Sequence, residues 1–263
     1  LAKMLRAGAY EILFSKREEI KSINSVTSLG GGKYYGNYYH RWIDEIPRLQ
    51  TLSSLNLNNV VTIPPGYSEE LVDCIREIVP NESEIYQSGY KEKWVHARRF
   101  LFLPYLSGRH CGFLPSKFIS NIQKKIVPKV VDNANEGSSL KLYVSRDQAD
   151  KRRILNNAEV VKTLEDHGFE SVLAERLSLR SQIRLFYNTR QIVAPHGAGL
   201  TNMIFSPSCK IVELFPGAPY THYRWLSESL GHEYRNIIGK SDANRNDDFE
   251  VDIGALEKTL NEL

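Results

Sequence analysis

The second half of the chain alternates short apolar runs with runs of helical character, and this alternation constrains the fold more than any other feature. LKLYVSR at 140–146 and FESVLAE at 169–175 are typical of strands, and two more apolar runs lie within 191–215. Strands that are apolar nearly throughout, separated by helices, predict a parallel sheet covered by helices on both faces. The fold class is therefore predicted to be α/β.

Helices are expected between these strands. Asn156 and Glu159 have the spacing of a capping box, which predicts a helix over 158–168. Ser178 is a suitable cap for a second helix over 179–189, whose apolar residues recur on one face. Together with the strands around them, these helices describe one α/β lobe.

The first half of the chain predicts a second lobe with less regular elements. Strands are expected at 59–63 and 97–103, with a helix at 68–79. The stretch 34–55 is mostly helical in character, with Pro47 as a kink or a restart.

A polar, glycine-bearing run at 132–139 separates the two halves and suits a linker. We therefore expect two α/β lobes, over 1–132 and 138–240. A C-terminal tail at 241–263 follows them and ends in a helix.

Composition excludes several classes of protein. The net charge of +3 over 263 residues is far from that of a nucleic-acid-binding protein, so no nucleic-acid partner is expected. The three cysteines contain no CxxC pair, and neither a zinc site nor a disulfide framework is predicted. No apolar run approaches the length of a membrane span, and no signal peptide is expected at Leu1.

These absences favour a cytoplasmic location. A peripheral association with a membrane is compatible with the sequence, and the lumen of the secretory pathway is the alternative. The lone acceptor sequence for N-glycosylation, at Asn81, is expected by chance and does not decide between them.

Polar groups follow three apolar strands of the second half. Arg146 ends the first strand, Glu175 ends the second, and His196, Gly197 and Gly199 follow the third, just before a short helix. Ligands of parallel sheets bind at the carboxyl ends of the strands. Glycine allows close approach to the backbone, and a helix N-terminus offers free amide groups to an anion.

Arg152 or Arg153 could add a second cation to this group. Each residue also has a plainer interpretation: a structural histidine at His196, a tight turn at the glycines, and solvated arginines. Their coincidence at neighbouring strand ends favours an anion site suited to a diphosphate. The sequence lacks GxGxxG, HExxH, GxSxG and an obvious DxD, so no metal-bound sugar nucleotide is expected.

The first half contributes NYYHRWIDEIPRL at 37–49. On a helix, His40 and Asp44 lie one turn apart on one face, and Arg48 follows one turn later. A carboxylate held by an imidazole and a cation can act as a general base. The spacing selects Asp44 as the base, and Glu45 is then expected to face solvent or to pair with a surface cation.

Two alternatives stay open for this stretch. His40 could be the base with Asp44 orienting it, or Asp44 and Arg48 could form an ion pair on the helix surface. The aromatic residues here, which include Tyr39, are expected to line the core and a cleft.

Three stretches together resemble the glycosyltransferase family 61 domain, whose members include plant xylan-decorating enzymes and animal O-linked N-acetylglucosaminyltransferases. They are HRWIDEIPRL at 40–49, LYVSRDQADKRRILNN at 142–157 and APHGAGLTNMIFSPSCKIVELF at 194–215. The last is the most specific. Arg41 occupies the position of the family's usual tryptophan, and Trp42 follows it.

The resemblance implies a GT-B-type fold, with two Rossmann-like lobes facing a cleft, and an inverting transferase. A nucleotide-sugar donor, expected to be UDP-linked, would serve as co-substrate, with no metal and no further cofactor. The acceptor would be a hydroxyl of a glycan or glycoconjugate. A non-catalytic nucleotide-sugar or glycan-binding module and an epimerase-like enzyme are the alternatives.

The resemblance also assigns residues. Asp44 and His40 are expected at the reaction centre, and Tyr39 and Arg48 at the acceptor. The donor would be bound in the second lobe by Arg146, Arg152, Glu175, His196, Gly197, Ala198, Gly199, Leu200 and Asn202.

Overall fold

The structure is a computed structural model that describes residues 21–29, 36–55, 59–64, 66–87, 95–104, 106, 114–131, 139–241 and 247–263. All but the last residue of the expected linker at 132–139 lies outside the described residues. The chain divides into two compact units. Unit 1 comprises Leu1–Gly36 and Arg48–Pro104, and unit 2 comprises Asn37–Pro47 and Tyr105–Leu263.

Unit 1 is built on a four-stranded parallel sheet. Its strands, in spatial order, are β3 (Glu84–Gln87), β2 (Val60–Ile63), β1 (Lys21–Ser28) and β4 (Val95–Phe100). Its helices are α3 (Gln50–Ser54) and α4 (Glu69–Ile78). Ser68 caps α4 by accepting a hydrogen bond from the amide of Leu71, and the helix buries Leu71, Ile75 and Ile78. Strands β1 and β3 were not predicted.

Unit 2 contains a five-stranded sheet in the order β6-β5-β7-β8-β9, and every neighbouring pair in it is parallel. The strands are β5 (Leu140–Val144), β6 (Glu170–Val172), β7 (Thr189–Pro195), β8 (Lys210–Phe215) and β9 (Glu233–Ile238). A two-stranded antiparallel ribbon, β10 (Lys240–Ser241) with β11 (Phe249–Glu250), stands beside it. The prediction of an α/β fold with parallel sheets is confirmed.

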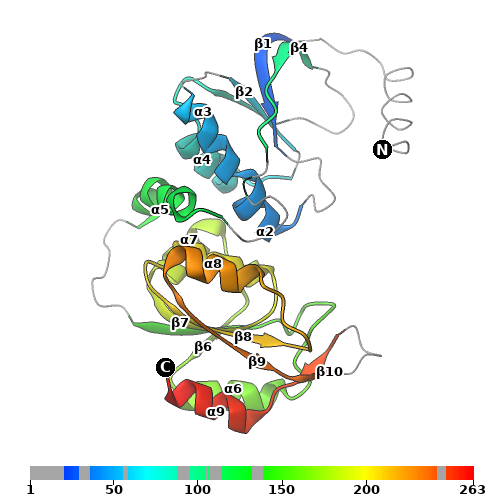
Figure 1. The fold of residues 1–263 in the computed structure, drawn as a ribbon, viewed down its shortest axis with the longest axis vertical. Helices are drawn as coiled ribbons and strands as arrows, with labels where there is room; N and C mark the ends of the chain where they lie inside the picture. Colours follow the sequence, from blue (N-terminus) through cyan, green and yellow to red (C-terminus); the bar gives the residue numbers. More distant parts are fainter. Residues whose placement is uncertain are drawn as a thin grey trace. The chain divides into compact units, whose positions relative to one another are not determined.

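Helices cover both faces of the unit 2 sheet, as Figure 1 shows. On one face lie α6 (Asn157–Asp166) and α9 (Ile253–Asn261), and on the other lie α7 (Leu179–Tyr187) and α8 (His222–Leu230). Helix α5 (Ser116–Val130) also belongs to unit 2. The core beneath α6 and α9 is apolar and includes Val160, Leu164, Val193, Val212 and Leu256. None of the described helices has both the length and the apolar character needed to cross a membrane.

The predicted elements of unit 2 are largely present, with three differences. The strand expected at 169–175 stops at Val172, so Glu175 lies in a 3-10 turn, η3 (Ala174–Arg176). The short helix after the loop is also 3-10, η4 (Ala198–Phe205). The expected capping box is wrong, because the Asn156 side chain bonds the backbone of Val251 instead of capping α6.

The segment Asn37–Pro47 packs within unit 2, whereas the sequence led us to expect it in the first lobe. Trp42 is fully buried there, with its ring 5.1 Å from that of Phe205. The Tyr38 hydroxyl donates to the Asn202 side chain at 2.6 Å. Burial of a large aromatic ring and a buried polar contact explain why this segment stays with unit 2.

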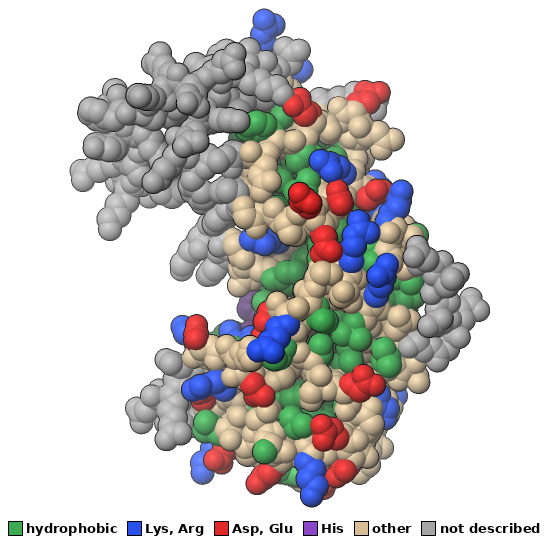
Figure 2. Space-filling model, turned by 180° about the vertical axis from the view of Figure 1, so that it is seen from behind, with side chains coloured by type: hydrophobic (Ala, Val, Ile, Leu, Met, Phe, Trp, Pro, Cys, Tyr) green, Lys and Arg blue, Asp and Glu red, His purple; other side chains and the backbone are tan. Residues whose placement is uncertain are grey.

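The surface in Figure 2 carries basic and acidic side chains interspersed over its described part, without a continuous field of one sign. This distribution agrees with the small net charge of +3.

Candidate active site

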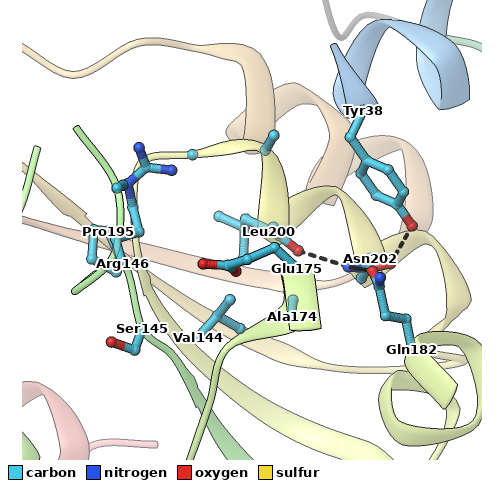
Figure 3. Close-up of a pocket in the computed structure, with 14 residues that line it drawn as sticks. Tyr38, Val144, Ser145, Arg146, Ala174, Glu175, Gln182, Pro195, Leu200 and Asn202 are labelled. Carbon is cyan, nitrogen blue, oxygen red and sulfur yellow. Dashed lines mark hydrogen bonds between the residues drawn. The ribbon is translucent and has the colours of Figure 1, made fainter. Parts of the chain in front are cut away.

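A cavity of about 340 Å³ opens at the carboxyl end of the unit 2 sheet. The ends of β5 and β7 and the turns η3 and η4 all contribute to its lining (Figure 3). Seven of the predicted donor-binding residues line it: Arg146, Glu175, Gly197, Ala198, Gly199, Leu200 and Asn202. Because the strands are parallel, their carboxyl ends meet at one edge of the sheet, and the residues predicted at those ends lie together there.

Arg146 provides the positive charge of this cavity, and Gly197 gives it room. A Cβ at Gly197 would lie only 2.1 Å from the Arg146 Nη1 atom. Burial, and next the neighbouring charge of Arg152, hold the pKa of Arg146 below its usual range. Its Nη2 donates to the carbonyl of Lys151, while its buried Nε has no partner among the described residues. A partly buried guanidinium whose Nε donor is unsatisfied suits an anionic ligand.

Asn202 joins three parts of the cavity wall by hydrogen bonds. Its Oδ1 accepts from the Tyr38 hydroxyl at 2.6 Å, and its Nδ2 donates to Gln182 Oε1 at 2.9 Å (Figure 3). The same nitrogen donates to the carbonyl of Gly199 at 3.1 Å, which holds the start of η4 in place. Asn202 is fully buried, so its role is to fix Tyr38 and the glycine turn against each other.

A second, smaller cavity of about 120 Å³ adjoins the first, since Gly197 and Ala198 line both. Its wall contains three histidines, His40, His196 and His222, together with Arg152. Arg152 has φ of 57°, a left-handed conformation that is rare outside glycine. The small cavity thus gathers titratable and cationic groups from distant parts of unit 2.

Aromatic residues pack around this smaller cavity. The Tyr223 hydroxyl donates to the Gly197 carbonyl at 2.7 Å, and burial raises the pKa of Tyr223 above its usual range. Tyr39 is 6% exposed, and its ring meets that of Tyr223 edge to face. Tyr39 therefore supports the wall as well as lining it.

His40 and Asp44 form the predicted pair, with His40 Nδ1 2.5 Å from Asp44 Oδ2. The continuous α-helix expected around them is wrong. Three residues of α2 (Tyr38–His40) lead into a π-helical turn, η1 (Arg41–Glu45), closed by a bond from the Ile46 amide to the Arg41 carbonyl. His40 lines the small cavity, and Asp44 lies behind it with a less exposed side chain, 11% against 21%.

The irregular turn interrupts the α-helical spacing on which the expected alignment of Arg48 with this pair depended. Pro47 starts a 3-10 turn, η2 (Pro47–Leu49), and Arg48 belongs to unit 1, where its guanidinium donates to the carbonyls of Leu103 and Ser28. Glu45 is 5% exposed, so the expectation that it faces solvent is wrong. The acceptor-binding roles of Tyr39 and Arg48 remain predictions.

His196 makes the second pair of this kind, with its Nδ1 2.5 Å from Glu213 Oε1. Its ring stacks on Phe215, with ring centroids 5.3 Å apart.

Arg153, considered as a second cation for the anion site, is instead paired with the fully buried carboxylate of Asp248. Among the described residues, no group of His, Cys, Asp and Glu side chains is placed to hold a metal ion.

Sequence reasoning missed three lining residues, Gln182, His222 and Tyr223, and it missed Glu213, which bonds His196 from behind the cavity wall. A usable signal existed for Glu213, a lone acidic residue inside the apolar run KIVELF. Charged residues are almost never fully buried unless they are paired, so such a residue marks a buried polar contact. His222 and Tyr223 begin α8, a helix that the sequence did not predict.

The sequence profile of the Glycosyltransferase 61 family matches residues 38–212, which is more than half of the chain. The chain belongs to this family. The match contains the small-cavity histidines His40 and His196 and all the predicted donor-site residues.

A relative in Drosophila melanogaster, the EGF domain-specific O-linked N-acetylglucosamine transferase, is 33% identical over 97 residues. The match covers 35% of this chain and 18% of the relative's length. Among solved structures, the E. coli heptosyltransferase WaaC with ADP-2-deoxy-2-fluoro heptose aligns with 91% of this chain and 99% of its own. The TM-score of that alignment is 0.46, at 9% sequence identity.

Proposed function

We propose that this family 61 chain transfers a sugar, with inversion, from a UDP-linked donor to a hydroxyl of a glycan or glycoconjugate. The observation that carries the proposal is the pair of cavities that share Gly197 and Ala198. The larger cavity has the size and the cationic group that a nucleotide requires, and the smaller one has the groups that can move a proton.

The nucleotide would lie in the larger cavity, with its diphosphate against Arg146 and the turn at Gly197. The missing Cβ of Gly197 lets a ligand approach the backbone of this turn. Arg146 and the amides that open η4 would stabilise the negative charge that grows on the leaving diphosphate. Arg152 lines the adjoining cavity and adds a second positive charge near the same turn.

The sugar would face the small cavity, where the His40–Asp44 pair accepts the proton of the acceptor hydroxyl. The hydroxyl oxygen attacks the anomeric carbon from the face opposite the diphosphate. The bond from that carbon to the phosphate oxygen breaks, and its electrons leave with the diphosphate. Because Asp44 holds Nδ1 of His40, the proton would pass to Nε2.

The pair can act in two ways, as the sequence already allowed. Asp44 was predicted as the base, and that assignment stays a prediction. The position of His40 in the cavity wall, with Asp44 behind it, favours His40 as the group that touches the acceptor and Asp44 as the group that orients it.

A thermal-shift screen against UDP-, GDP-, CMP- and dTDP-sugars tests the donor site. A ligand at 100 times its Kd stabilises the folded state by about 2.7 kcal/mol, so the preferred nucleotide should raise the Tm clearly.

Donor consumption, measured with and without sugar acceptors, then tests the transfer. Binding without consumption under any acceptor would support a non-catalytic module and overturn the proposed activity. Consumption without an acceptor product would indicate an epimerase-like or hydrolytic enzyme.

A further inference from the structure

Glu213 is a fully buried carboxylate whose two oxygens both have partners. Its Oε1 lies 2.5 Å from His196 Nδ1, and its Oε2 accepts a hydrogen bond from the Tyr234 hydroxyl at 2.6 Å. His196 lines the small cavity, whereas Tyr234 lines a separate cavity of about 330 Å³. The three side chains thus form one connected group through the interior of unit 2.

Strand register explains why these residues meet. Glu213 on β8 pairs with Ala194 on β7, and Ile211, two residues earlier, pairs with Tyr234 on β9. Side chains two residues apart on a strand share a face, so Tyr234 lies diagonally across from Glu213. His196 lies two residues beyond Ala194, and its amide donates to the carbonyl of Leu214, which continues the ladder.

The chemistry of a buried carboxylate fixes the proton of His196. An ionised carboxylate is stable in the interior only when hydrogen bonds satisfy it. To donate to Glu213, His196 must carry its proton on Nδ1. Burial raises the pKa of Tyr234, and the charge of Glu213 raises it further, so the hydroxyl keeps its proton and remains the donor.

The groups that face His196 come from several elements. Tyr220 and His222 lie tilted against its ring and Tyr223 meets it edge-on, from the start of α8 and the loop before it. His40, Tyr39 and Arg152 share its cavity, and Arg146 lies in the adjoining one. Glu213 is therefore the carboxylate bound to His196 beside a wall that is otherwise imidazole, phenol and guanidinium.

We propose that Glu213 is a positioning residue for donor binding. It holds His196 with Nδ1–H directed at the carboxylate, so that Nε2 acts on the donor's diphosphate, and Tyr234 holds Glu213 in turn. When the diphosphate is bound, the same carboxylate stabilises the imidazolium form of His196, in which both nitrogens donate. This inference rests on the proposed function.

The test measures the affinities of UDP and uridine by calorimetry between pH 5.5 and 8.5, for the wild type, Glu213→Gln and Tyr234→Phe. Uridine lacks the phosphates, so the ratio of the two affinities isolates the contact with the diphosphate. Glu213→Gln should lower UDP affinity by about tenfold or more, since a charge-assisted hydrogen bond is lost, and leave uridine within about twofold. It should also flatten the pH dependence of the UDP to uridine ratio.

Tyr234→Phe keeps the contact between Glu213 and His196 and should lower UDP affinity by a smaller factor, with uridine again unchanged. Tyr86→Phe in unit 1 is the matched control and should change neither affinity. Should Glu213→Gln fail to fold, Tyr234→Phe decides the question.

A purely structural role for Glu213 would weaken the binding of both ligands equally, whatever the change in Tm. That result, or a UDP to uridine ratio equal to that of the wild type in the folded variants, overturns the proposal. A wild-type protein that binds neither UDP nor uridine fails in a different way. That result would contradict the proposed donor site, and the inference about Glu213, which rests on that site, would be wrong as well.

Discussion

Two histidine–carboxylate pairs in unit 2 share one distance and differ in the burial of the carboxylate and in the separation of the partners along the chain. In both, a histidine Nδ1 lies 2.5 Å from a carboxylate oxygen. His40 and Asp44 are four residues apart on one helical segment; the His40 side chain is 21% exposed and that of Asp44 is 11% exposed. His196 and Glu213 are 17 residues apart on neighbouring strand ends, and the carboxylate is fully buried with a second donor, Tyr234.

The difference bears on what each pair can do. A partly exposed pair can exchange a proton with a substrate and then with water. A buried carboxylate with both oxygens bound holds its partner in one orientation, because losing either hydrogen bond leaves a desolvated acceptor. We therefore assign proton transfer to the pair of His40 and Asp44, and donor orientation to the pair of His196 and Glu213.

The largest expected effect follows from Asp44→Asn. Either as base or as the group orienting His40, Asp44 supplies the charge that general-base catalysis needs, so turnover should fall by about 10²–10⁴-fold. Nucleotide affinity should stay within about twofold. Steady-state kinetics and calorimetry measure the two quantities, with the exposed Asp73→Asn as the matched control.

One result would break this comparison, and a second would decide which member of the first pair is the base. A large loss of nucleotide affinity in Asp44→Asn would place the first pair at the donor. If His40→Ala is the more damaging change and Asp44→Asn keeps a tenth of the activity, His40 is the base.

Arg146→Ala should produce the next largest effect, on affinity. Loss of a charge-assisted contact to phosphate corresponds to about 1.5–3 kcal/mol, or roughly 10–150-fold in the Kd of UDP. Turnover at saturating donor should fall less than affinity. Arg76→Ala, an exposed arginine of unit 1, is the control. A Kd for UDP within twofold of the wild type would show that the diphosphate does not lie beside Arg146.

Gly197→Ala tests donor orientation, the role assigned to the second pair, because Gly197 directly follows His196 and lines both cavities. The new Cβ would collide with the end of the Arg146 side chain, which can move, so the fold should persist. The displaced guanidinium should weaken UDP binding by up to about tenfold, with little change in Tm. Gly217→Ala is the control, because a Cβ there meets nothing within 4 Å. Unfolding of Gly197→Ala, or unchanged binding, would contradict the proposed approach of the ligand to this turn.

Chelation should have the smallest effect. In the proposed chemistry both pairs act without a divalent cation, since arginine and imidazole groups stabilise the diphosphate. Turnover after exhaustive treatment with a chelator should match that of untreated enzyme. Complete loss that manganese restores would show that a metal takes part, and would reduce the electrostatic role given to the second pair.

The sequence predicted what depends on local pattern. Alternating apolar and helical runs were enough for the parallel sheet, and the Ser178 cap of α7 is present as expected. The pairing of His40 with Asp44 was accessible because it depends on a spacing of four residues.

Other features depend on register and irregular backbone, which a single sequence does not reveal. Glu213 acquires both partners only when β8 lies between β7 and β9. The continuous helix that was expected to reach Arg48 is wrong, because a π-helical turn and a 3-10 turn at Pro47 interrupt it. Tyr38 and Asn202 are 164 residues apart, and nothing local in either segment predicts their hydrogen bond.

The π-helical turn at Arg41–Glu45 also bears on which insertions and deletions this segment can tolerate during evolution. Such a turn accommodates one residue more than the α-helical turn around it, so it has the form of an insertion that was kept. Deleting one residue between His40 and Asp44 would restore a regular helix. His40 and the carboxylate would then lie three residues apart, a spacing that still places two side chains side by side on one face of an α-helix. The turn can therefore change its length without separating the pair, and lineages that lose the extra residue would keep both side chains on one face.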